Sequence, residues 1–150
     1  MKKLVPLVLL TIFSAVQMNA QQKQVFTKNN IAVNGYDVVA YFTDSNAVKG
    51  TEEHAVSWKD AKWLFAKAEH ASLFKANPDK YAPQYGGYCA FGCSRGYKAK
   101  TDPDAWTIVN GKLYLNYNSA VKNTWSRDME NYIKKSDAAW LLIKDEPMKQ

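Results

Sequence analysis

The chain has few residues that ligate metals or act as nucleophiles, since it contains only two cysteines and two histidines. Three residues separate Cys89 from Cys93, a spacing that excludes a Cys-x-x-Cys redox pair and a Cys-x-x-Cys-His haem attachment. No serine, histidine and aspartate set has the local context of an activated nucleophile. The sequence therefore predicts a protein that is not an enzyme.

The excess of positive over negative charge is also small. The 20 lysines and arginines exceed the 14 acidic residues by a net charge of only +6, and the basic residues are scattered. Lys134-Lys135 is the only adjacent basic pair beyond the first residues of the chain. Nucleic-acid-binding domains usually carry a clustered basic patch, so no nucleic-acid partner is predicted.

Long hydrophobic runs are limited to one segment, Leu4–Val16. It follows Lys2-Lys3 and precedes Met18-Asn19-Ala20, which is the pattern of a cleaved signal peptide over residues 1–20. No cysteine follows the run to carry a lipid, and no other segment is apolar enough to span a bilayer. We expect a soluble exported protein, periplasmic or secreted, with no membrane anchor after cleavage.

Removal of residues 1–20 leaves roughly 130 residues, which is enough for one domain with a hydrophobic core. We expect a flexible arm over residues 21–30, a domain over 31–141 and a polar tail over 142–150. The predicted fold class is α+β in a single compact domain. It would contain two β-hairpins, a short helix between them and a long C-terminal helix.

Turn dipeptides mark both hairpins. Lys59-Asp60 separates the alternating runs 54–58 and 61–65, and Asn110-Gly111 separates the apolar runs 106–109 and 112–117. The run 35–42 is consistent with either a strand or a short helix capped by Asp37.

Helical spacing and breakers place the two helices. The short helix covers about residues 67–76 and ends before Pro78. The long helix covers about residues 119–140, with Asn118 as its N-cap. Its buried stripe is predicted to contain Val121, Trp125, Met129, Ile133 and Trp140.

The two cysteines leave three alternatives open. On a helix, residues four positions apart have Cα atoms about 6 Å apart, which suits two thiolates on one soft metal. The same separation lies within disulfide range, although helical geometry seldom gives a good disulfide. Free or buried thiols are the third alternative.

Four segments of the chain resemble the exported YHS-domain proteins: residues 35–42, 78–90, 102–103 and 111–117. The resemblance covers about residues 31–140. The YHS name marks a domain related to small heavy-metal-binding modules, some of them attached to copper-transport ATPases. The resemblance therefore implies a fold and suggests metal binding.

In the metal-binding YHS modules, a histidine opens a hairpin and two cysteines follow it. Laid on this sequence, the histidine falls on His54 and the cysteines on Ala66 and His70. Alanine cannot ligate a metal, whereas histidine can. The implied metal site combines His54 and His70 with Cys89 and Cys93, and this mixture of imidazole and thiolate suits copper or zinc.

Two functions follow as hypotheses. The first is non-catalytic handling or sequestration of copper or zinc by the exported protein. The second is a metal-free module that binds a small ligand or a protein through an aromatic pocket. The residues expected to line that pocket are Tyr81, Tyr85, Tyr88, Trp63 and Tyr117.

Overall fold

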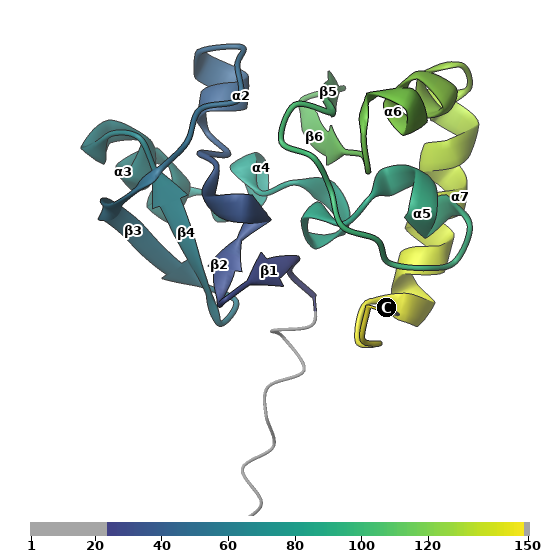
Figure 1. Ribbon diagram of the computed structural model, residues 1–150, viewed down its shortest axis with the longest axis horizontal. Helices are drawn as coiled ribbons and strands as arrows, with labels where there is room; N and C mark the ends of the chain where they lie inside the picture. The colour runs from purple at the N-terminus through teal and green to yellow at the C-terminus, as the bar shows by residue number, and fades with distance from the viewer. Residues whose placement is uncertain (1–23, 149–150) are drawn as a thin grey trace, which may run out of the picture.

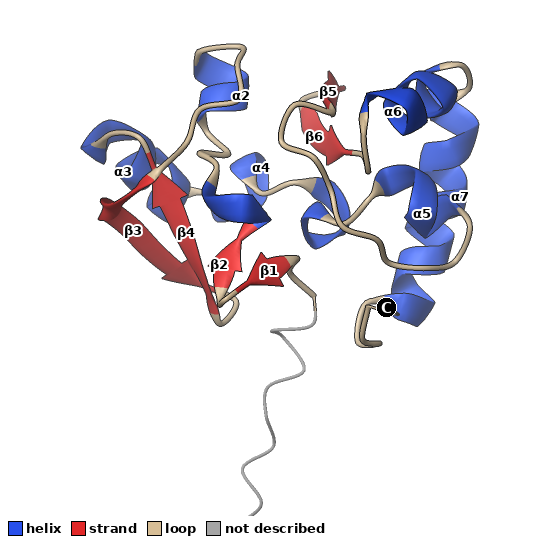
Figure 2. Cartoon of the chain, viewed as in Figure 1, coloured by secondary structure: helices blue, strands red, loops and turns tan. Residues whose placement is uncertain are grey.

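A computed structural model describes residues 24–148 of the chain (Figure 1). It has the α+β architecture that the sequence predicts, with two small sheets and several short helices (Figure 2). In chain order the elements are β1 (Thr27–Lys28), β2 (Ile31–Ala32), η1 (Val33–Gly35), α2 (Ala40–Thr43), β3 (Thr51–Trp58), β4 (Ala61–Phe65), α3 (Ala68–Ala76), α4 (Pro78–Tyr81), η2 (Gln84–Gly87), α5 (Ala90–Ser94), β5 (Trp106–Val109), β6 (Lys112–Leu115), α6 (Ser119–Ser126) and α7 (Met129–Ile143).

Both predicted hairpins are confirmed. In the first, β3 and β4 pair antiparallel, and Lys59 and Asp60 adopt left-handed conformations with φ of 49° and 56°. In the second, β5 and β6 pair antiparallel around Asn110 and Gly111, with φ of 50° and 72°. Two left-handed residues in succession are what a two-residue type I′ turn requires, so these local dipeptides determine both turns.

The first hairpin belongs to a four-stranded sheet with the order β1-β2-β4-β3. Helix α3 packs against this hairpin, and Trp63, Phe65 and Phe74 form the centre of the first hydrophobic cluster. A second cluster lies around Tyr114 and Trp125, beneath helices α6 and α7. The sheet with α3 and the helical region with α5, α6 and α7 occupy opposite sides of the molecule (Figure 1).

The predicted long C-terminal helix is wrong in one respect, because two helices replace it. Asn118 does cap the first one, and its Oδ1 accepts a hydrogen bond from Val121 N at 2.9 Å. Helix α6 then ends, and Asp128 leaves the helical region with φ −151° and ψ 52°. The Asp128 carboxylate accepts a bond from the Asn131 side chain at 3.0 Å. Aspartate favours such local bonds over a helix interior, which explains the break.

The run 35–42 contains a short helix rather than a strand. Asp37 is fully buried, and its Oδ1 accepts hydrogen bonds from Val39 N at 2.9 Å and Ala40 N at 3.1 Å. These bonds satisfy donors at the start of α2. Tyr41 is also buried, and its hydroxyl donates to Pro103 O at 2.8 Å. The segment therefore anchors α2 inside the first cluster.

The described part of the predicted flexible arm is packed against the domain, which corrects that expectation. Val25 and Phe26 are buried, and Phe26 N donates to Gly86 O at 2.9 Å. Strand β1 pairs with β2 immediately afterwards. Apolar side chains at positions 25 and 26 supply the reason, since burying them removes hydrocarbon from water. Residues 21–23 of the arm, like the predicted signal peptide, lie outside the described residues.

The predicted polar tail also begins later than expected. Helix α7 continues to Ile143, and the side chain of Lys98 reaches the chain beyond it. Its Nζ donates to Lys144 O at 2.6 Å and to Glu146 O at 2.5 Å. A cation at the carbonyl end of a helix is favourable, so Lys98 caps α7. No helix within residues 24–148 combines the length and the apolar character needed to cross a bilayer.

Candidate functional site

The four predicted metal ligands are distributed over both sides of the fold. His54 lies on β3 and His70 on α3, whereas Cys89 and Cys93 lie at the start and within α5. Helices α3 and α5 are on opposite sides of the molecule (Figure 1). Within residues 24–148, no three histidine, cysteine or acidic side chains gather so that they could hold one metal ion. The structure therefore does not bring the predicted donor set together.

His70 instead forms a buried bridge to Asp37. Its Nδ1 lies 2.7 Å from Asp37 Oδ2, and the two side chains are 2% and 0% exposed. The same carboxylate oxygen accepts a hydrogen bond from Ala66 N at 2.9 Å. His70 Nε2 lies 3.1 Å from Thr43 Oγ1. One carboxylate thus joins the start of α2, the end of β4 and helix α3, and sequence reasoning identified only its capping role.

Both cysteines are buried free thiols, with Cys89 at the N-cap of α5 and Cys93 within that helix, and Cys93 belongs to the second cluster. Cys89 Sγ accepts a bond from Gly92 N at 3.4 Å and donates to Asn116 Oδ1 at 3.6 Å. Burial raises the pKa of both thiols, and it raises the pKa of Cys93 to about 12. Both sulfurs are therefore protonated at neutral pH, and each would have to release its proton before it could bind a metal.

The five residues of the alternative aromatic pocket separate into three groups. Trp63 and Tyr85 line one groove. Tyr81 and Tyr88 are buried among core side chains. Tyr117 is 43% exposed and lies at another surface hollow, beside Lys100. Only the first group brings two of the five predicted residues together at one cavity.

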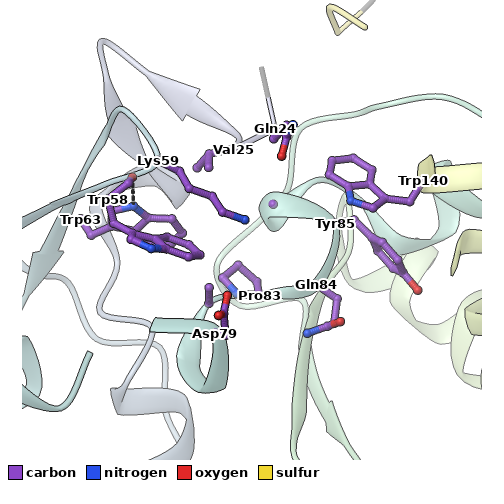
Figure 3. Close-up of a pocket in the computed structure, with 12 residues that line it drawn as sticks. Gln24, Val25, Trp58, Lys59, Trp63, Asp79, Pro83, Gln84, Tyr85 and Trp140 are labelled. Carbon is purple, nitrogen blue, oxygen red and sulfur yellow. Dashed lines mark hydrogen bonds between the residues drawn. The ribbon is translucent and has the colours of Figure 1, made fainter. Parts of the chain in front are cut away.

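That cavity, which we call the aromatic groove, lies between the turn of the first hairpin and helix α7 (Figure 3). It has a volume of about 170 Å³. Four separate parts of the chain supply its walls: the N-terminal segment, the hairpin turn, the stretch from α4 to η2, and α7. The lining residues are Gln24, Val25, Trp58, Lys59, Trp63, Asp79, Ala82, Pro83, Gln84, Tyr85, Gly86 and Trp140.

Core contacts hold the wall on the hairpin side. The Trp63 indole N–H donates to Trp58 O at 3.0 Å, and the two rings meet edge to face with centroids 5.6 Å apart. Trp58 also meets Phe74 edge to face at 5.6 Å. Lys59 extends from the turn into the groove, and its Nζ lies 4.6 Å from the centroid of the Trp58 ring (Figure 3). The lysine ammonium is thus placed over an aromatic face.

The wall opposite is fixed by helix α7. Tyr85 donates its hydroxyl to Asp137 Oδ1 at 2.8 Å, and its ring lies 6.0 Å from that of Trp140. Burial and the bond to Asp137 raise the pKa of Tyr85 far above its ordinary value, so the phenol stays protonated as a donor. Trp140 itself is half-buried and borders the groove from α7 (Figure 3).

The floor depends on a close approach of two backbones. Gly86 has φ 62°, and a Cβ there would lie 1.7 Å from Gln24 O. Only glycine fits such an approach, so Gly86 allows the N-terminal segment to cross η2 and complete the groove. The sequence shows glycines at 86 and 87, but Gln24, the partner that requires glycine at position 86, is 62 residues away.

Sequence reasoning did not identify Trp58, Lys59, Asp79 or Trp140 as residues of one site. Trp58 and Lys59 were assigned only to a hairpin, and Trp140 only to the buried stripe of a helix. An exposed lysine directly after a tryptophan in a tight turn was the available signal. This signal alone does not indicate a binding site, because the other walls of the groove come from distant parts of the chain.

Comparison of the chain with protein-family models, with curated proteins and with solved structures finds no match in any of the three. The likeness to exported YHS-domain proteins therefore remains a prediction from the motifs.

Proposed function

We propose that this domain is a metal-free, non-catalytic module that binds a small ligand containing one ring in the aromatic groove. One observation carries the proposal: two half-buried tryptophans, Trp58 and Trp140, border a cavity into which a lysine side chain also points. Small-molecule sites typically combine aromatic walls with a few converging polar groups. The groove has both, and its parts come from distant segments of the chain.

The size of the groove limits what it can hold. Its volume of about 170 Å³ is close to that of an engineered cavity of roughly 150 Å³ that holds one benzene ring. A single six-membered ring therefore fits, with any larger substituent projecting past the exposed residues Lys59 and Asp79. The polar rim gives such a ligand hydrogen-bonding partners.

Handling of copper or zinc is the second candidate, and one observation favours it. Asp37 holds Nδ1 of His70, as a carboxylate often does behind a metal-bound histidine, and Asp44 Oδ1 lies 3.9 Å from Nε2. The number of donors argues against a metal site here, because His70 and Asp44 supply only two, whereas a structural zinc site uses four. Cys93 lies in the other cluster, and Cys89 caps the helix that carries it, α5. We therefore rank the groove first.

Nuclear magnetic resonance of the five tryptophan indole N–H groups tests the proposal directly. A set of single-ring compounds should shift the signals of Trp58 and Trp140 and leave Trp106 and Trp125 unchanged. Trp140→Phe should weaken binding, whereas the matched variant Trp106→Phe, away from the groove, should not. A second titration with Cu(II) and Zn(II) addresses the alternative. Tight metal binding that perturbs His70, with no groove ligand found, would reverse the ranking.

A further inference from the structure

We infer that the ligand of the aromatic groove is an acidic sugar, a pyranose ring that carries a carboxylate, as in a uronic acid. This inference rests on the proposed function and specifies its ligand class. Three features support it: the indole of Trp140 on the groove wall, the polar side chains that line the groove, and the charge of Lys59.

A sugar ring presents two kinds of surface at once. Its C–H faces pack on the negative face of an aromatic ring, while its hydroxyl groups point outward around the rim. Trp140 provides an indole on one wall of the groove, held by its contact with Tyr85 at 6.0 Å. Gln24, Gln84 and Asp79 surround the same cavity with amide and carboxylate groups. This is the combination that a sugar requires.

The side chain of Gln24 is already oriented by the protein. Its Nε2 donates to Asp145 Oδ1 at 2.7 Å, while the side chain also borders the groove. This bond leaves the amide oxygen as an acceptor for a ligand hydroxyl. Asp79 can accept from hydroxyls only, because an ionised carboxylate has no donor. An apolar aromatic ligand would make no hydrogen bond to either group, whereas a sugar hydroxyl can donate to both.

Lys59 selects for negative charge. Its Nζ stands over Trp58 and points into the groove, and within residues 24–148 it forms no salt bridge. The left-handed turn at the hairpin tip fixes the backbone that carries it. Asp79 lines the same groove from α4 and would repel a second anion. One carboxylate, placed at the hairpin end of the ring, therefore fits the charge pattern.

Glucuronic acid, glucose and benzoate are the probes for this inference, titrated into the purified protein at low salt. Glucuronic acid should shift the Trp58 and Trp140 signals and bind about fivefold more tightly than glucose, the advantage expected from one exposed ion pair. Lys59→Gln should remove that advantage. Lys100→Gln should keep it, because Lys100 stands over Tyr117 in the same manner, 5.6 Å from the ring, but outside the groove.

The outcomes separate this inference from the proposed function. Equal affinity for glucuronic acid and glucose would overturn the assignment of charge. Binding of benzoate at Trp140 without glucuronic acid would overturn the sugar while the groove stays a ligand site. If no probe and no single-ring compound shifts Trp58 or Trp140, both proposals fail. If glucuronic acid binds, digalacturonic acid and galacturonic acid distinguish the source of the ligand. Tighter binding of digalacturonic acid than of galacturonic acid would identify the end of a polysaccharide. Equal affinity for the two would identify a free sugar acid.

Discussion

Replacement of Asp37 by asparagine should cost the domain about 3 kcal/mol of unfolding free energy. The carboxylate is fully buried and receives four hydrogen bonds, two on each oxygen. Asparagine keeps the oxygen that caps α2 but replaces the other with an NH₂ group. That group faces Ala66 N–H, which cannot turn away, and His70, which can change its tautomer and accept.

The magnitude follows from these two contacts. A hydrogen bond to a charged acceptor contributes about 1.5–3 kcal/mol, and a buried donor left without a partner costs about 1–3 kcal/mol. The tautomer change at His70 recovers part of the loss, so we take about 3 kcal/mol as the net effect. Urea unfolding followed by tryptophan fluorescence measures it.

Asp60→Asn is the matched control, since Asp60 is exposed and sits in a left-handed turn that asparagine tolerates equally well. It should change the unfolding free energy by less than about 0.5 kcal/mol. A loss below about 1 kcal/mol for Asp37→Asn would refute the reasoning, because it would mean that Asp37 is not the acceptor that joins α2, β4 and α3. Nitrogen-15 shifts of His70 should reveal the tautomer change independently.

Further predictions concern the core, the thiols and the two ends of the chain. Trp125→Ala should cost roughly 3–5 kcal/mol, as deletion of a large buried aromatic does, and a smaller loss in urea would place this face in solvent. Because burial raises the thiol pKa values, Cys93 to about 12, both cysteines should resist a thiol reagent from pH 7 to pH 9 until the protein unfolds; rapid labelling of native protein would contradict this. The raised pKa also means that the unfolded chain loses its thiol protons first, so stability should fall as pH rises above about 9. Gly86→Ala should cost about 1–3 kcal/mol for the left-handed backbone alone and should displace residues 24–26, seen as loss of amide protection at Phe26. If residues 1–20 are a signal peptide, the intact mass of the protein recovered outside the cytoplasm should correspond to a chain that begins at Gln21.

Local chemistry was enough to predict the parts of the fold that depend on neighbouring residues. Lys59-Asp60 and Asn110-Gly111 determine their turns because the residues themselves tolerate left-handed conformations. Asn118 was identified as a cap for the same reason, since its bond to Val121 N spans only three residues. The helix break at Asp128 also depends on local residues, because a side-chain hydrogen bond there competes with a continuous helix. The periodic apolar pattern continues through the break, so it predicted one helix.

The candidate site could not be predicted in the same way because its residues meet only through the tertiary fold. Trp58 and Trp140 come from elements far apart in sequence, and Gln24 completes the groove only because Gly86 admits its backbone. The apolar pattern is the same for a tryptophan in the core and for one at the edge of a cavity. The apolar pattern therefore predicted that Trp125 is buried, but it also put Trp140 in the buried stripe, where the structure leaves that side chain half-exposed.

The bridge between Asp37 and His70 explains why the motifs resemble a metal-binding domain although the predicted donors do not meet. In the resemblance, Ala66 and His70 occupy the positions of two cysteine ligands, where a metal would tie the end of the hairpin to the following helix. Here Asp37 makes that connection: the same Oδ2 atom receives Ala66 N–H at 2.9 Å and lies 2.7 Å from His70 Nδ1. Both positions thus have a mechanical role that needs no metal. The motif around Asp37 therefore has a structural role. The proposed ligand site is the groove between the hairpin turn and α7, which Lys59 and Trp140 line.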